Sequence, residues 1–174
     1  KISLISLSGS GMIGIPGISS RLFGALSIAQ VNIILITQAS SEYSITFAVS
    51  PNDVDKAVEA VNIEFEFEIL NGKVNPVQVE LNKSIVALVG EKMSGQVNVA
   101  GKMFSALGVN GINVRAIAQG SSERNISVVI DEKDVKKALN VLHERHFEKD
   151  HKRVNLFVVG VGNVGATLVD QIKE

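Results

Sequence analysis

The sequence predicts an α+β fold made of two related units in tandem, and two observations carry this prediction. First, the string Ile36–Glu42 (ITQASSE) returns as Ile117–Glu123 (IAQGSSE), 81 residues further along the chain. Laid over each other without a gap, Ser6–Val49 and Ala87–Ile130 share fourteen identical residues. Second, strand-like and helix-like patterns follow one another in the same order in both copies. The shared polar string needs a reason beyond packing, because polar loop residues vary freely unless they contact something.

The first copy reads as βαββαβ. Its expected strands are apolar or alternating runs, and its expected helices carry apolar residues at helical spacing. In chain order they are a strand at Ile2–Ser8, a helix from Ile18, strands at Ile33–Thr37 and Tyr43–Val49, a helix from Val54 and a strand at Glu64–Ile69. The last strand is expected from the strict alternation of Glu with Phe and Ile.

The second copy repeats this order through five elements and shows no clear sixth element before Asp150. They are a strand at Ser84–Val89, a helix at Val97–Leu107, strands at Val114–Ala118 and Ile126–Ile130, and a helix at Asp131–His146. Residues Asn71–Lys83 read as a linker, in which a short strand at Val77–Leu81 is left open. We expect domains at 1–80 and 81–150, followed by a different segment at 151–174.

The composition excludes several classes of function. A formal net charge of −1 gives no electrostatic case for binding nucleic acid or an anionic membrane. The chain has no cysteine, which removes disulfides, thiolate catalysis and most zinc sites. No apolar run approaches the ~20 residues that span a bilayer, and we expect a cytoplasmic protein. Units this small bury limited cores, so we also expect a homodimer.

Two segments match Gly-x-Gly-x-x-Gly. The first, Gly9–Gly14, lies between a strand and a helix, as in a dinucleotide site. The next strand, however, ends at Thr37-Gln38 without the carboxylate that contacts a ribose hydroxyl. We therefore interpret this segment as a flexible loop leading into a helix N-terminus, whose free N–H groups suit a carboxylate.

The second match is the better dinucleotide fingerprint. Gly160, Gly162 and Gly165 directly follow the apolar run Val154–Val159 and open an amphipathic pattern. The acidic residue expected about 20 positions on would lie at or beyond Glu174. We expect a truncated Rossmann βα start, unable to bind a dinucleotide within this chain.

No metal or catalytic centre is assigned. His143, His146 and His151 lie near acidic residues, but the stretch is dense in Lys and Arg, which favours a solvated charged surface. No Ser–His–acid arrangement or P-loop is present, and nothing in residues 1–150 has the pattern of a catalytic site.

Gln38 and Gln119 stand at the same place in the two copies, opposite the strand–helix loop of each. Recurrence at that place favours a ligand pocket over an ordinary polar strand end. Glutamine donates and accepts hydrogen bonds without carrying charge. It therefore suits a neutral polar group such as a hydroxyl rather than an ammonium, which would call for a carboxylate.

These motifs resemble a known family. They are GSGMIGIPG at 9–17, TQASSEYS at 37–44, AQGSSERN at 118–125 and NLFVVGVGNVG at 155–165. The first three are similar to the paired ACT domains of aspartate kinases. The last is similar to the start of homoserine dehydrogenase, and this order is that of the bifunctional aspartokinase–homoserine dehydrogenases.

The resemblance implies two ferredoxin-like βαββαβ ACT domains that form a regulatory region between two catalytic domains. Such regions sense L-threonine in bifunctional enzymes and L-lysine in many monofunctional ones, and the neutral Gln agrees with threonine. The effector positions that the resemblance implies are Met12, Ile15, Gly17, Ile18, Gln38, Ser40, Ser41, Glu42, Gln119, Ser121 and Ser122. No cofactor is expected in this chain, whereas the parent enzyme is expected to use ATP with Mg²⁺ and NAD(P).

The second copy is expected to be the weaker site, because it has Lys92, Gln96 and Asn98 at or beside positions where the first has glycine. In the family, the second ACT domain usually borrows a strand from sequence before the first, which here would lie before Lys1. With no initiator Met, the chain is expected to be a piece of a longer protein. The alternatives are a lysine sensor of a monofunctional aspartate kinase, a detached regulator acting on a partner, and an NAD(P)-dependent enzyme completed by sequence after Glu174.

Overall fold

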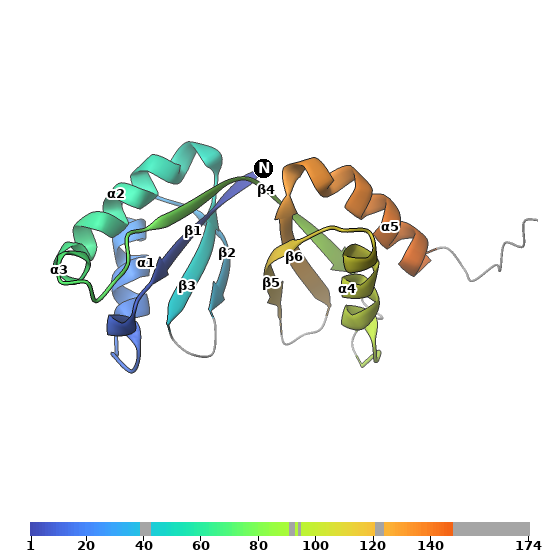
Figure 1. Cartoon of the computed structure of the whole chain (residues 1–174), viewed down its shortest axis with the longest axis horizontal. Helices are drawn as coiled ribbons and strands as arrows, with labels where there is room; N and C mark the ends of the chain where they lie inside the picture. The colour runs from blue at the N-terminus through green and yellow to red at the C-terminus, as the bar shows by residue number, and fades with distance from the viewer. Residues whose placement is uncertain (39–42, 91–92, 94, 121–123, 148–174) are drawn as a thin grey trace, which may run out of the picture.

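The computed structural model describes residues 1–38, 43–90, 93, 95–120 and 124–147. They form two α/β halves that share one curled antiparallel sheet (Figure 1). The strands are β1 (Ile2–Ser8), β2 (Ile33–Gln38), β3 (Ser44–Val49), β4 (Gln78–Val89), β5 (Val114–Gln119) and β6 (Asn125–Asp131). The helices are α1 (Ile18–Ile28), α2 (Val54–Glu64), α3 (Glu66–Leu70), α4 (Val99–Val109) and α5 (Val135–Phe147). Short 3-10 turns lie at η1 (Ser10–Met12), η2 (Pro51–Asp53) and η4 (Glu132–Asp134).

The two halves are joined through β4, in the sheet order β2-β3-β1-β4-β6-β5. The first part of β4 pairs with β1, with Gln78 opposite Ser6, and the second part pairs with β6, with Val89 opposite Asn125. Lys83 stands where the pairing changes, because it lies opposite Ile2 on one side and Asp131 on the other. The expected runs at Val77–Leu81 and Ser84–Val89 therefore form one continuous strand, which begins at Gln78 rather than Val77.

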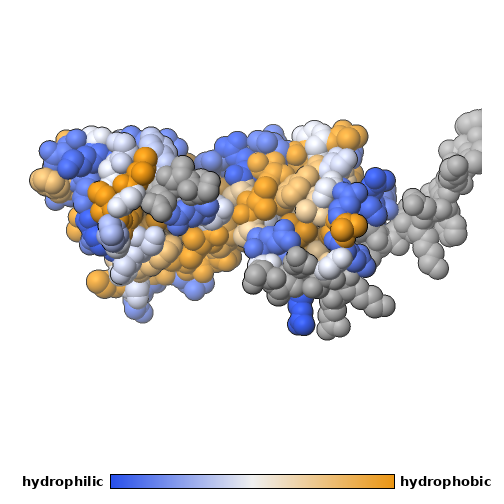
Figure 2. Space-filling view, turned by 90° about the horizontal axis from the view of Figure 1, so that it is seen from below, coloured by the Kyte–Doolittle hydropathy of each residue, from blue (hydrophilic) through white to orange (hydrophobic). Residues whose placement is uncertain are grey.

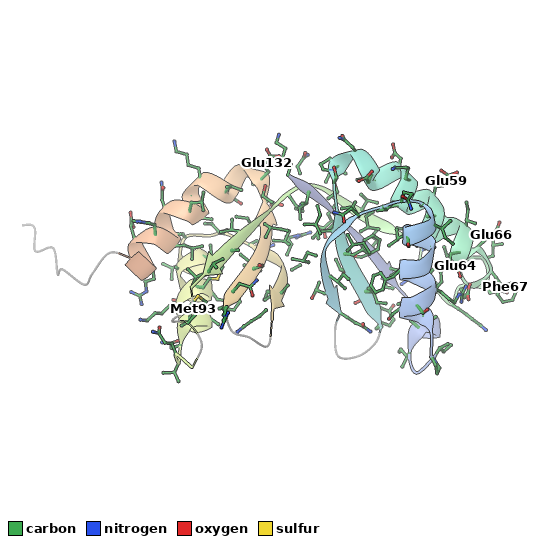
Figure 3. The ribbon with its side chains drawn as sticks, turned by 180° about the vertical axis from the view of Figure 1, so that it is seen from behind. Glu59, Glu64, Glu66, Phe67, Met93 and Glu132 are labelled. Carbon is green, nitrogen blue, oxygen red and sulfur yellow. The ribbon has the colours of Figure 1, made fainter. Side chains whose placement is uncertain are left out.

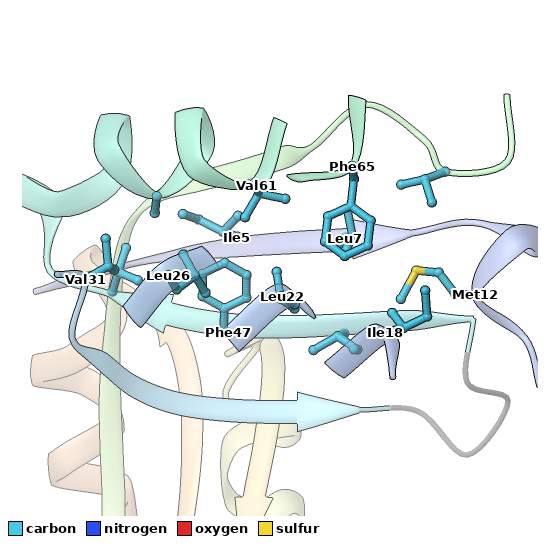
Figure 4. Close-up of a cluster of buried hydrophobic side chains, with 14 of the residues drawn as sticks. Ile5, Leu7, Met12, Ile18, Leu22, Leu26, Val31, Phe47, Val61 and Phe65 are labelled. Carbon is cyan, nitrogen blue, oxygen red and sulfur yellow. The ribbon is translucent and has the colours of Figure 1, made fainter. Parts of the chain in front are cut away.

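Each half has its own core on the outer face of the sheet. In the first half α1 and α2 cover that face, and the side chains of Leu7, Leu22, Phe47 and Phe65 are fully buried between the layers (Figure 4). The second half repeats this arrangement under α4 and α5.

The sheet curls because its inner face is also apolar. A third cluster packs residues of both halves against each other: Ile2, Leu4, Leu35, Ala48, Ala116 and Val129. As a result β2 and β5, the two end strands of the sheet, lie near each other at the centre of the molecule (Figure 1).

The repeat is visible in the irregularities of the sheet as well as in its order. The β2–β3 pairing shifts register between Ile33 and Leu35. The β5–β6 pairing shifts between Val114 and Ala116, the positions 81 residues later. Two copies that share a bulge at the same place share a backbone design, which supports the tandem prediction.

The expected strand at Glu64–Ile69 is wrong, because these residues end α2 and form α3. Phe65 is fully buried, whereas Phe67 is 70% exposed and points away from the sheet (Figure 3). Glu64 and Glu68, four residues apart, both bond Arg21 on α1. The spacing that the fold uses is therefore helical, and the alternation of Glu with Phe was misleading.

Candidate functional site

A pocket of about 490 Å³ opens between the loop after β1, the first turn of α1 and the end of β2. We call it the first-copy pocket. Its lining residues are Met12, Gly14–Ser20, Gln38 and Ile45. The predicted positions Met12, Ile15, Gly17, Ile18 and Gln38 therefore surround one space, of a size usual for small-molecule sites.

Sequence reasoning missed Ser19, Ser20 and Ile45 among the lining residues. The serines could have been found, because a Ser-Ser pair in the first turn of a helix places hydroxyls beside the free N–H groups of that turn. Ile45 could not, since it reads as an ordinary core residue and is indeed 1% exposed.

The loop depends on two glycines with left-handed backbone. Gly14 has φ of 66° and Gly17 has φ of 89°, and Gly17 is the N-cap of α1. A Cβ at either position would meet open space, so glycine serves the backbone conformation here and not close packing. Gly17 supplies no side-chain cap. The first-turn N–H groups of α1 therefore have no capping side chain at Gly17 and lie at the wall of the pocket.

Gly9 and Gly11 are needed for a different reason. A Cβ on Gly9 would lie 2.3 Å from the Lys73 carbonyl oxygen, and one on Gly11 would lie 2.6 Å from the Lys73 Cβ. The Gly11 N–H also donates to the Lys73 carbonyl at 2.8 Å. Close packing against another segment thus accounts for these two glycines of Gly9–Gly14 without a nucleotide.

Among the described residues, those that line the first-copy pocket carry no ionisable side chain. The nearest charge in α1 is Arg21, whose Nε lies 2.8 Å from Glu64 Oε1 and whose Nη1 lies 2.5 Å from Glu68 Oε1. These bonds raise the pKa of Arg21, Glu68 contributing most, and the bond from Arg21 lowers the pKa of Glu68. The pocket itself offers N–H groups, hydroxyls, one amide and apolar walls, which suits a small zwitterion better than a cationic side chain.

Gln38 and Gln119 are not brought into one pocket. Each lies at the end of its own strand and also lines one of two matching clefts between the halves, of about 380 Å³ and 480 Å³. In the smaller cleft Gln38 faces residues 114–117 of β5, and in the larger one Gln119 faces residues 34–36 of β2. The two clefts are related by the repeat.

The structure corrects the reason given for a weaker second copy. Asn98, the counterpart of Gly17, has the same left-handed backbone with φ of 69°, and Gly95 matches Gly14 with φ of 74°. The backbone course is therefore kept at these two positions. The two copies differ in the side chain at this position. The Asn98 side chain lies against Gly101 in the first turn of α4, and a Cβ added to Gly101 would stand only 2.2 Å from Asn98 Oδ1. Asn98 thus covers part of the first turn of α4, which is open in α1.

Several predicted positions lie outside the described residues: Ser40, Ser41, Glu42, Ser121 and Ser122, and the fingerprint glycines Gly160, Gly162 and Gly165. Among the described residues, no group of three or more His, Cys, Asp or Glu side chains could hold a metal ion. Within the same part of the chain, no helix is long and apolar enough to cross a membrane.

Apolar side chains reach the surface in both halves, on the side of the molecule where the loop after β1 lies (Figure 2).

Comparison with known proteins agrees with the repeat. Residues 5–65 and 86–146 each match the family model of the ACT domain. The whole chain is 42% identical to a stretch of "Bifunctional aspartokinase/homoserine dehydrogenase 2, chloroplastic" from Arabidopsis thaliana, and it spans 19% of that relative's length.

Solved structures share the fold. The regulatory subunit of aspartate kinase from Thermus thermophilus, in a ligand-free form, is 26% identical with a TM-score of 0.71, over 85% of this chain and 94% of that one. E. coli aspartokinase III in complex with lysine and aspartate is 25% identical with a TM-score of 0.65, over 84% of this chain and 31% of that one.

Proposed function

This chain belongs to the ACT domain family, and we propose that it is the amino-acid-sensing regulatory region of an aspartate kinase fused to a homoserine dehydrogenase, with L-threonine as its effector. Two ACT segments in one chain support a regulatory role. The relative from Arabidopsis thaliana, a bifunctional aspartokinase/homoserine dehydrogenase by name, supports this parent enzyme. Because the chain spans about a fifth of that relative's length, catalysis would reside in sequence outside it.

The observation that carries the choice of ligand is the chemistry of the first-copy pocket. At one wall, the first turn of α1 presents N–H groups to which a carboxylate can bind. At the opposite wall Gln38 presents a neutral amide, which can accept from and donate to a hydroxyl. Threonine carries both groups on a small skeleton, and its methyl group would contact Ile15, Ile18 or Ile45.

Lysine is the alternative effector, and E. coli aspartokinase III gives it a specific basis because that structure holds lysine. The first-copy pocket disfavours it here. A buried ammonium needs a carboxylate or several acceptors, and none of the described residues that line this pocket is acidic.

The mechanism follows from linkage. An effector that binds one arrangement of the parent enzyme better than another shifts the population toward that arrangement. A coupling of about 1–3 kcal/mol is usual for such regulation. The parent would use ATP with Mg²⁺ in the kinase and NAD(P) in the dehydrogenase, both bound outside the described residues. We further propose a homodimer as the working form.

Calorimetric titration of the chain with L-threonine, L-lysine and L-methionine tests the proposal. We expect saturable binding of threonine and at least about tenfold weaker binding of lysine, since an unpaired buried ammonium costs more than 1.4 kcal/mol. Equal affinity for the two would reject threonine specificity, and tighter binding of lysine would favour the lysine sensor. No heat with any of the three would contradict an amino-acid effector altogether.

A further inference from the structure

Two walls of the first-copy pocket, α1 and the loop after β1, are both bonded to a third segment whose residues do not line the pocket. We call residues 64–75 the clamp segment: the end of α2, all of α3 and the turn that leads to β4. One arm of this segment reaches α1 through Arg21, and the other reaches the loop after β1 through Lys73. Figure 3 shows Glu64 beside α1.

The first arm is built around the Arg21 guanidinium. Besides its two carboxylate bonds, Arg21 Nη2 donates to the Glu64 main-chain carbonyl at 2.8 Å. That carbonyl ends α2, where helical carbonyls lack intrahelical partners. The guanidinium also lies 4.6 Å from the centroid of the Phe65 ring, a cation–π distance. Arg21 therefore fixes the break between α2 and α3 against the first turns of α1.

The second arm is made by the main chain. The Glu68 carbonyl accepts from the N–H groups of Lys73 at 2.9 Å and Val74 at 3.1 Å. The Lys73 carbonyl in turn accepts from Gly11 N–H, and Asn75 N–H donates to the Ser8 carbonyl at 2.7 Å. These bonds set the loop that begins the first-copy pocket directly on the clamp segment.

Glu68 is the joint between the arms, because its side chain holds Arg21 and its carbonyl holds Lys73. Its side chain is 18% exposed, and Oε2 is buried with no hydrogen-bond partner among the described residues. Among the described residues, Arg21 is the cation that this carboxylate bonds directly, with Lys73 contributing a weaker attraction. The carboxylate therefore depends mainly on Arg21, since an unpaired buried charge is strongly unfavourable. Removal of Arg21 should therefore displace Glu68, and with it the turn at Lys73.

The second copy serves as an internal comparison, and its sequence lacks this arrangement. The counterparts of Arg21, Glu64 and Glu68 are Lys102, Arg145 and Lys149, so like charges stand where the first copy has opposite ones. Its second helix, α5, also runs unbroken through residue 147.

We propose that Arg21 and Glu68 are positioning residues, which hold α1 and the Gly9–Gly17 loop in the geometry that binds the effector, in the first copy only. The affinity part of this inference rests on the proposed function. The clamp segment continues into β4, the strand that pairs with both halves. Effector binding against a fixed loop would thus act on the strand shared by the two copies.

Amide hydrogen exchange of the ligand-free chain tests the clamp itself. In Arg21→Met and Glu68→Gln, the amides of Gly11, Lys73 and Val74 should exchange at least about tenfold faster, as expected when a local opening becomes 1.4 kcal/mol easier. Amides of β3 and α4 should stay protected, which shows that both variants remain folded. Lys56→Met is the control, because it removes an ion pair with Asp53 at the start of α2, and neither residue lines the first-copy pocket or the clefts at Gln38 and Gln119. Unchanged protection at Gly11 and Lys73 in both folded variants would overturn the inference.

Calorimetric titration with L-threonine tests the positioning role. If the competent loop geometry falls to about a tenth of the population, the apparent Kd rises about tenfold. We expect this in Arg21→Met and Glu68→Gln, a smaller loss in Arg21→Lys, and the parent Kd in Lys56→Met. Faster exchange with an unchanged Kd would overturn the positioning role. If the parent chain does not bind threonine, the proposed function fails, and the exchange experiment still decides whether the clamp exists.

Discussion

Gly17 and Asn98 stand at the same position of the two copies and share a left-handed backbone, with φ of 89° and 69°. Glycine adopts this conformation without strain, and asparagine is among the few other residues that tolerate it. The loop backbone is thus conserved between the copies, while the surface that it presents is not. The difference lies in the Asn98 side chain, which covers part of the first turn of α4.

This relationship predicts an order of stability for substitutions at Gly17. Gly17→Val should lower the free energy of unfolding by about 1–2 kcal/mol, the cost of left-handed backbone in an ordinary residue. Gly17→Asn should cost less, because Asn98 already shows that asparagine fits this backbone. Urea unfolding of the two variants measures the difference, with Asn98→Gly as the matched control. Equal losses in both Gly17 variants would contradict the backbone argument.

The two glutamines should contribute unequally to threonine binding. Gln38→Ala removes the one side-chain amide among the described residues that line the first-copy pocket, and should weaken binding there by about 1–2 kcal/mol, the scale of a lost buried hydrogen bond. Gln119→Ala should do less to the same site, because Gln119 lies on the other half. Calorimetric titration of both variants provides the comparison. A Gln38→Ala variant that binds threonine like the parent would remove the basis of the assignment.

Stability at acid pH should report the Arg21–Glu68 pair. The bond from Arg21 holds the pKa of Glu68 below its ordinary value of 4.5 in the folded chain. The pair therefore stabilises the fold fully above pH 4.5, and this contribution is lost as pH falls through the lowered pKa. Urea unfolding from neutral to acid pH should show a smaller decline in Glu68→Gln than in the parent. Asp131, whose pKa is lowered mainly by Lys83, keeps its own acid dependence in both proteins. Parallel pH profiles would show that the pair does not contribute.

Much of the fold could be predicted from local sequence, because the repeat and the apolar spacing each reflect nearby residues. The first-copy pocket could be predicted for the same reason, since its loop and helix start are contiguous in the sequence. Features that depend on residues far apart in the sequence could not be predicted. Arg21 meets Glu64 and Glu68 from 43 and 47 residues away, so nothing near Glu64–Ile69 signals that these carboxylates need helical spacing. The continuity of β4 likewise depends on partners in both halves.

The fingerprint at Gly160–Gly165 predicts a negative result. NADPH should show no saturable binding to this chain, because the nine residues after Gly165 are too few to supply the acidic ribose contact, expected about 20 positions on, and the second half of a dinucleotide crevice. Quenching of nucleotide fluorescence upon titration is the measurement, and a complete NADPH-dependent dehydrogenase is the positive control. Saturation at micromolar nucleotide would show that the segment binds without those parts.

We expect two chains to associate and so to bury apolar surface that remains exposed in both halves of the single chain. The end strands of the sheet keep apolar residues partly in water, with Ile34, Ile36 and Ile117 each 45–47% exposed. Cores of this size gain from a neighbour, and an end strand offers unpaired N–H and C=O groups to another end strand. We therefore expect a homodimer in which the sheets of two chains continue into each other, with a light-scattering mass of about twice 18.6 kDa.

Ile36→Lys should shift the dimer toward the monomer, since a charge at such an edge opposes pairing. Leu139→Lys, on the outer helix α5, is the control with similar exposure at 54%. A mass of one chain at every concentration would contradict the dimer, and a dimer weakened only by Leu139→Lys would move the interface to the helices.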